Sequence, residues 1–295
     1  MANNGYTTTD QMADSLPTVV AQARVVRKYD GVMQQLADRV NLGQGVGSDW
    51  REISLAQLTA VNITENTEED SPQQLSDSVF TVTPSVISVH TVITDRTARN
   101  ISKNVFAKTG QLGQQAIETQ KDKDGLALLD GATTALGSAG SSLTSGVIAA
   151  GAYRVRGNTT EPWSGKVAFV LHSFQMKDLY DELVAGVGTY ASVEGLTAEV
   201  FKNAFNLPIA NAQGFTDDNI TIDSADDAKG GVFASGANGA VVLVQARAPW
   251  VKMVRNEALG GGASEMFHRD EYAYGERSAG NWIFEVISDA TAPTS

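Results

Sequence analysis

The stretch that organises this sequence is residues 94–136, TDRTARNISKNVFAKTGQLGQQAIETQKDKDGLALLDGATTAL. Thr94 and Asp95 carry side-chain oxygens that can accept the free N–H groups of a first helical turn, so we expect a helix to start there. Apolar residues then recur at helical spacing on one face, namely Ile101, Val105, Leu112, Ala116, Leu128, Ala132 and Leu136. At about 1.5 Å per residue the segment would be roughly 60 Å long, which is too long for an ordinary core helix.

Glycines at positions 110, 113 and 125 fall inside this expected helix. Each costs about 1 kcal/mol relative to alanine in a helix interior, and we therefore expect a bend or break near residues 123–125. Residues 137–142 are rich in Gly and Ser and predict a flexible connection after the helix.

Composition sets the broad class of the protein. The 295 residues are 42% apolar, which is enough to bury a sizeable core in one or two domains. The absence of cysteine excludes disulfides, thiolate metal sites and cysteine nucleophiles. No apolar run approaches the length of a membrane helix and the first residues do not resemble a signal peptide, so we expect a soluble protein made in the cytosol. A net charge of −12 argues against DNA recognition.

The first part of the chain predicts an arm followed by a helix. Residues 1–16 are polar and offer little to bury, while Pro17 suits a first helical turn. Apolar residues at steps of three and four then predict a helix that runs through Val40. The glycines of residues 43–47 follow this helix and lack the Lys and Ser/Thr of a phosphate-binding loop, so we assign them no nucleotide site.

Two alternating segments predict a long β-hairpin. The first places Ile53, Leu55, Val61 and Ile63 on one side, and the second, residues 79–94, is rich in β-branched residues. The connecting residues 65–72 are acidic and turn-forming, and residues 49–77 hold seven acidic residues against one basic residue. A two-stranded ribbon of this length is marginal by itself in water, so we expect it to lie on another surface.

The second half of the chain predicts a compact α/β unit and returning strands. Residues 166–171 suit a buried strand, followed by a helix from Ser173 and another from Thr197 that Pro208 stops. Short strands are expected at 220–222, 231–234 and 240–245. Further strands are expected at 250–254, 266–274 and 282–286, with the glycines of 260–262 interrupting them.

The three histidines allow a nearly complete search for nucleophilic and metal sites. His90 lies in the β-branched segment and suits a packed strand position. His172 precedes Ser173, but adjacent residues in extended backbone point to opposite faces, so we expect it to end a strand. His268 lacks the second histidine that a zinc-binding helix supplies. We therefore assign no catalytic residue, no cofactor and no metal, although paired carboxylates leave no sequence signature and a carboxylate-based hydrolase stays an alternative.

The order of elements resembles that of the major capsid proteins of tailed bacteriophages, a fold shared with encapsulins and with the floor domain of herpesvirus capsids. The resemblance covers nearly the whole chain. Its most specific parts are residues 92–96 leading into Asn100 and Ile101, the run Gln120 to Asp130, and the strand and helix start of residues 167–176.

The resemblance implies an α+β chain with the tailed-phage major capsid fold. Its parts would be an N-terminal arm (1–48), an extended β-ribbon or E-loop (49–85), a peripheral domain with a long spine helix (86–150), an α/β axial domain (151–247) and returning strands (248–295). It also implies a self-assembling subunit of a virion, forming hexamers and pentamers around double-stranded DNA that is held without sequence-specific binding. An encapsulin-like nanocompartment shell is the alternative within the fold.

Partner contacts follow from the acidic ribbon tip. We expect Glu65, Glu68, Glu69 and Asp70 to lie near a neighbour's basic groups, for which Arg24, Arg27 and Lys28 are the candidates. Residues 51–83 contain no lysine, which is the residue that relatives use for covalent cross-links, so we expect a non-covalent shell, with a cement protein as a further partner. The short stretch before the ribbon predicts a separate scaffolding protein and no N-terminal processing, and the resemblance adds a portal protein.

Overall fold

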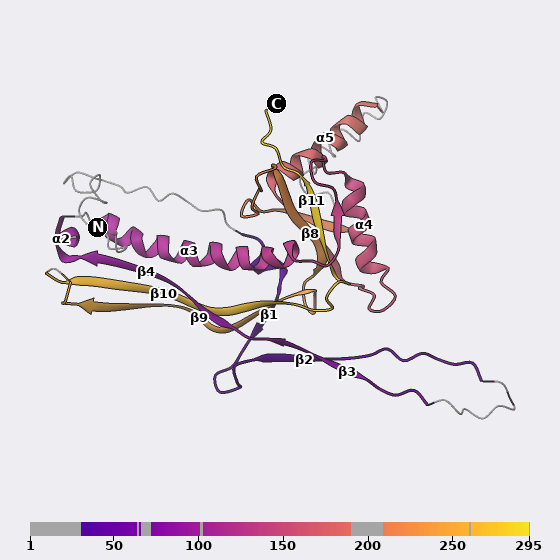
Figure 1. Ribbon diagram of the computed structural model, residues 1–295, viewed down its shortest axis with the longest axis horizontal. Helices are drawn as coiled ribbons and strands as arrows, with labels where there is room; N and C mark the ends of the chain where they lie inside the picture. The colour runs from indigo at the N-terminus through magenta and orange to yellow at the C-terminus, as the bar shows by residue number, and fades with distance from the viewer. Residues whose placement is uncertain are drawn as a thin grey trace.

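The computed structural model describes residues 31–63, 65, 72–100, 103–189, 209–259 and 261–294. Figure 1 shows an elongated molecule in which a long helix lies along one sheet, a second sheet with its own helices stands at one end, and a narrow ribbon projects below them. The two sheets hold four and five strands, and the ribbon holds two.

The long helix is α3, Lys103–Asp130, preceded by the short α2, Asp95–Asn100. Helix α3 runs without interruption through residues 123–125, so the expected break there is wrong. Gly125 instead permits close packing, because a Cβ at this position would lie 2.9 Å from Met33 Cβ and 3.1 Å from Tyr274 Cζ. The helix ends at Asp130, and Leu136, which we expected on its apolar face, belongs to strand β5, Ala135–Gly137.

The four-stranded sheet lies under this helix. Its order is β1 (Asp38–Asn41), β9 (Val241–Asn256), β10 (Ala263–Glu276) and β4 (Ser85–Thr94), with β10 antiparallel to both neighbours. The helix expected to run through Val40 is wrong in its last part. Helix α1 covers only Met33–Leu36, and β1 then pairs in parallel with residues 242–245 of β9.

The five-stranded sheet carries most of the buried core. Its order is β5, β11 (Ile283–Asp289), β8 (Asp227–Ser235), β6 (Lys166–Leu171) and β7 (Ala212–Thr216). Helices α4, Ser145–Arg156, and α5, Ser173–Thr189, belong to the same end of the molecule (Figure 1). The strand expected at 166–171 is confirmed as β6, the strand expected at 231–234 lies within the longer β8, and the strand expected at 282–286 overlaps β11 from Ile283 onward. Residues 220–222 contribute only an isolated bridge at Ile222. The helix expected from Thr197 lies outside the described residues.

The ribbon consists of β2, Trp50–Leu55, and β3, Asp77–Val82. The paired part of the ribbon is shorter than the sequence predicts. Residues 56–63 form no strand, and β4, which we expected to continue the hairpin, pairs with β10 in the four-stranded sheet. The last pair of the ladder is Leu55 opposite Asp77, and one further backbone hydrogen bond runs from the N–H of Ala56 to the carbonyl of Ser76 at 2.9 Å.

Candidate assembly surfaces

The root of the ribbon is fixed to the body by one buried arginine. Arg277, directly after β10, donates from Nε to Glu52 of β2 and from Nη1 to Asp38 of β1, each at 2.7 Å. Nη1 also donates to the carbonyl of Gly239 at 3.0 Å, and the guanidinium lies 5.5 Å from the ring centre of Trp50. Because a guanidinium presents several donors in a fixed fork, one side chain can hold β1, β2 and the loop after β8 together.

A small apolar cluster supports this root. Trp50 and Phe80 meet edge to face at 5.9 Å and pack with the buried Val82 against residues of β9. Gly275 of β10 makes the approach possible, since a Cβ there would lie 2.4 Å from Val82 and 2.7 Å from Phe80. The ribbon is therefore anchored at its base by packing as well as by charge.

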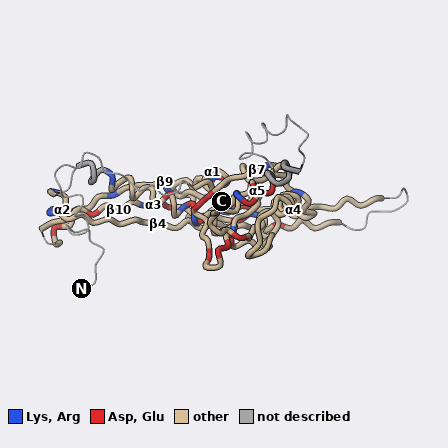
Figure 2. The backbone as a smooth tube through the Cα atoms, turned by 90° about the horizontal axis from the view of Figure 1, so that it is seen from above, with Lys and Arg blue, Asp and Glu red and all other residues tan. Residues whose placement is uncertain are grey.

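Beyond the root the ribbon exposes apolar side chains to water. Its outward row joins Ile53 to Val79 across the two strands, and these side chains are 63% and 57% exposed. Other large apolar residues exposed on the ribbon are Leu55, Leu58, Val61, Ile63 and Leu75. Within the described part of residues 53–76 the only charged residue is Glu65, and Figure 2 shows the ribbon projecting beyond the body with almost no charged positions. A concentration of exposed apolar side chains of this kind is typical of an interaction surface.

The tip carries the acidic residues that we proposed as contacts. Glu65 is exposed and lies in a turn. The other candidates, Glu68, Glu69 and Asp70 of the tip and Arg24, Arg27 and Lys28 of the N-terminal segment, lie outside the described residues. The structure thus places one member of the proposed set and does not test the pairing.

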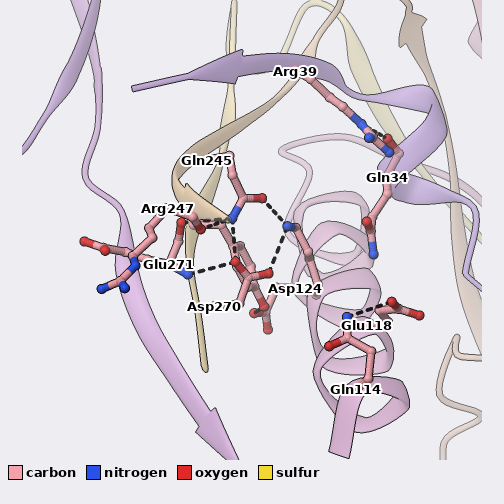
Figure 3. Close-up of polar contacts among 11 residues, drawn as sticks. Gln34, Arg39, Gln114, Glu118, Asp124, Gln245, Arg247, Asp270 and Glu271 are labelled. Carbon is pink, nitrogen blue, oxygen red and sulfur yellow. Dashed lines mark hydrogen bonds and ion pairs between the residues drawn. The ribbon is translucent and has the colours of Figure 1, made fainter. Parts of the chain in front are cut away.

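A buried polar cluster joins helix α3 to the sheet (Figure 3). Lys121 of α3 donates to Asp270 of β10 at 3.1 Å and hydrogen-bonds to Gln245 of β9, and its ammonium lies 4.7 Å from the ring centre of Tyr272. Burial lowers the pKa of Lys121, and the adjacent carboxylate of Asp270 opposes that shift. Next to it, Tyr272 donates to Asp124 at 2.7 Å, so two contacts fix the register of the helix on the strands.

The histidines occupy structural positions. His90 lies in β4 and stacks on Phe267 at 4.1 Å. His172 follows β6, as expected for the end of a strand, and burial lowers its pKa although Asp218 opposes the shift. His268 of β10 packs against Gly113 of α3, where a Cβ would lie 2.4 Å from the imidazole, and burial lowers its pKa.

Among the described residues no group of three His, Cys, Asp or Glu side chains is arranged to hold a metal ion. No helix in that part of the chain combines the length and apolar character needed to cross a membrane.

Sequence reasoning missed Arg277 because its partners lie 225 and 239 residues away in the chain. A single arginine after a strand carries no pattern that points to them. The apolar row of the ribbon was visible as alternation at Ile53 and Leu55, but its exposure required the three-dimensional structure.

The arrangement of helix, two sheets and ribbon defines a mixed α+β fold, the fold of phage major capsid proteins, and encapsulins share it. The capsid subunit of cyanophage Pam1 superposes with a TM-score of 0.72 over 99% of this chain and 100% of its own, at 11% identity. The head structure of Helicobacter pylori bacteriophage KHP40 gives 0.69 over 92% and 95%, at 12% identity. The SrpI encapsulin of Synechococcus elongatus gives 0.62 over 96% of both chains, at 10% identity.

At identities of 10–12% these likenesses define the fold. No family model and no curated protein matches the sequence.

Proposed function

We propose that this protein is the major capsid protein of a bacteriophage, a structural subunit that assembles as hexamers and pentamers into an icosahedral shell around double-stranded DNA. The observation that carries the proposal is the ribbon, which is firmly held at its root and exposes apolar side chains along its length. Burial against another subunit would remove these apolar side chains from water. The full-length likeness to the capsid subunit of cyanophage Pam1 supports the same function.

In this proposal the residue ranges expected from the sequence correspond to the parts of a capsid subunit. Residues 49–85 are the E-loop that reaches a neighbouring subunit, 86–150 form the peripheral domain with the spine helix, and 151–247 form the axial domain. Residues 1–48 are the N-terminal arm and 248–295 the returning strands. The continuity of α3 over 28 residues supports a rigid spine between the two sheets.

The acidic tip is proposed to face basic groups of the next subunit. Its exposed member, Glu65, and its neighbours Glu68, Glu69 and Asp70 would meet Arg24, Arg27 or Lys28 there. Exposed ion pairs contribute about 0–1 kcal/mol each, so such contacts would act through repetition over many subunits and weaken with salt.

Other partners follow from the assembly itself. A separate scaffolding protein would guide closure, a portal would occupy one vertex, and a cement protein would reinforce a shell whose ribbon has no lysine for cross-links. The mature particle would then run as single subunits on a denaturing gel, and a ladder of covalent multimers would contradict a non-covalent shell.

An encapsulin-like compartment is the second candidate, because the SrpI encapsulin shares the fold over nearly the whole chain. The two functions differ in content, since a phage head holds DNA and a compartment of this kind holds protein. Nuclease digestion and mass spectrometry of particles purified from the native source would distinguish them.

The test of the proposed function is assembly. Purified protein is concentrated with and without the scaffolding protein of the same phage and followed by light scattering and electron microscopy. Closed shells of uniform size support the proposal. A stable monomer under all conditions would exclude it.

A further inference from the structure

Two aspartates meet in the interior where three chain segments converge. Asp122 lies on α3 and Asp217 lies directly after β7, and both side chains are fully buried. The third segment is residues 31–33, which leads into α1. Gly31 sits so close that a Cβ there would lie 1.8 Å from Asp122 Cγ, which excludes any side chain at this position.

Neutral donors occupy all four carboxylate oxygens. Asp122 accepts from the backbone N–H of Met33 and from Nδ2 of Asn219, each at 3.0 Å. Asp217 accepts from the backbone N–H of Val32 and of Asn219, again at 3.0 Å. The two aspartates therefore accept hydrogen bonds from two consecutive backbone amides, Asp217 from Val32 and Asp122 from Met33.

The surrounding charges leave the pair without a counter-ion in the described part of the chain. Ionisable groups on the elements around it are Lys121 and Asp124 of α3, Arg39 of β1, Asp270 and Tyr274 of β10, Asp218, and His172. Lys121 pairs with Asp270, Arg39 donates to the carbonyl of Gln34, and none of these cations forms an ion pair with Asp122 or Asp217. Two neighbouring buried carboxylates without a cation repel each other, and their burial disfavours the ionised form, so ionisation of both is unfavourable.

We propose that Asp122 and Asp217 share one proton and so form a clasp, which holds residues 31–33 to helix α3 and to the loop after β7, and which opens when that proton is lost at alkaline pH. The shared proton replaces a repulsion between two charges by a hydrogen bond.

The electrostatics of Asp217 agree with this geometry. Burial raises the pKa of Asp217 to about 7, the amides of Val32 and Asn219 oppose the shift, and the neighbouring Asp122 adds to it. The proton therefore belongs to the pair and is shared between Asp217 and Asp122. The folded protein binds this proton more tightly than the unfolded chain, so the clasp is intact below neutral pH and weakens as pH rises through about 7.

The experiment uses the unassembled full-length subunit, so its outcome is independent of the proposed capsid function. Infrared spectroscopy in heavy water detects the carbonyl band of a protonated carboxylic acid, and hydrogen exchange read by mass spectrometry reports the protection of residues 31–36. The variants are Asp217→Asn and Asp122→Asn, which keep the shape but remove one carboxylate. Asp226→Asn, at an exposed aspartate with φ of 61° that asparagine tolerates, is the matched control.

We expect the acid band in the wild type and in Asp226→Asn at pH 6, its disappearance by pH 9, and its absence from Asp217→Asn. Over the same range, after correction for intrinsic exchange, the wild type should lose at most about tenfold of its protection at residues 31–36 for each pH unit above the transition, whereas both clasp variants should change little. A wild type without the acid band overturns the shared proton. A band that titrates without any loss of protection overturns the clasp. If either variant does not fold, the wild-type titration against Asp226→Asn decides alone.

Discussion

Arg277 and Glu52 lie 225 residues apart in the sequence, yet Nε of the arginine donates to Oε2 of the glutamate at 2.7 Å. This contact ties the ribbon to the end of β10, and the same guanidinium reaches Asp38 of β1. A buried side chain at the end of the sheet is thus one of the contacts that hold the base of the ribbon to the body.

Replacement of Arg277 tests this anchor. Arg277→Ala leaves Asp38 without its buried partner and should lower the free energy of unfolding by about 3 kcal/mol. Arg277→Lys keeps the charge but not the fork and should lose part of the stability. The measurement is urea unfolding of the unassembled subunit, with Arg255→Ala, at an exposed ion pair with Asp95, as the control that should change little. Equal effects of both alanine variants would contradict a special role for Arg277.

Substitution by alanine at two glycines of α3 should change the stability of the protein in opposite directions. At Gly113 the new methyl group would meet the imidazole of His268 at 2.4 Å, whereas at Gly110 nothing lies within 4 Å. Gly113→Ala should therefore destabilise by about 1–3 kcal/mol through overpacking. Gly110→Ala should stabilise by about 0.5–1 kcal/mol because alanine is the better helix former. Thermal unfolding of both proteins checks the signs, and stabilisation by both would show that α3 does not press on β10 at Gly113.

The stability that the buried ion pair of Lys121 and Asp270 contributes should require both side chains. Lys121→Met leaves the Asp270 carboxylate buried without a cation and should cost about 3–5 kcal/mol. Adding Asp270→Asn removes that uncompensated charge and should recover much of the loss. A double-mutant cycle measures the coupling between the two positions. Additive effects would mean that the two side chains do not interact.

His268 should make the fold sensitive to acid. Burial lowers the pKa of His268 below its ordinary 6.5, so the unfolded chain binds the proton more readily than the folded protein. Stability is then lost as pH falls through about 6.5, the unfolded value, and is retained above it. His268→Gln should reduce the loss of thermal stability between pH 7.5 and pH 5, with the remainder due in part to His172, whose pKa is also lowered. An unchanged slope would contradict this role.

The exposed row of the ribbon should matter for assembly and not for folding. Ile53→Ser with Val79→Ser removes apolar surface that contacts no core, so the unassembled subunit should stay within about 0.5 kcal/mol of the wild type. Assembly followed by light scattering should require a higher protein concentration. Gln57→Ser, an exposed polar change on the same ribbon, is the control and should assemble normally. Equal assembly of the apolar variant would show that this row is not an interface.

The sequence predicted features that depend on local pattern. The helical spacing after Thr94 and the apolar run Lys166–Leu171 gave elements that the structure confirms as α3 and β6. The expected break near Gly125 was wrong because the glycine accommodates Met33 and Tyr274 at close range, and propensity alone cannot distinguish close packing from a break.

Features that depend on distant partners could not be predicted. Residues 38–41 form a strand because they pair with residues 242–245, some 200 residues later, and this pairing overrides the helical spacing that leads to Val40. The contacts of Asp217 and of Arg277 also join residues far apart in the sequence, so local pattern could not predict them. Of the acidic tip, only the exposure of Glu65 is tested by the structure.

The central claim is that the ribbon becomes buried against a neighbouring subunit when shells form. A cryo-electron microscopy reconstruction of the assembled particle tests it most directly, because it locates residues 53–79 relative to the next subunit. The account predicts that Ile53, Leu55 and Val79 lie against a neighbour, with the Arg277 anchor intact at the root. A particle in which these side chains face solvent on both sides of the shell would contradict it.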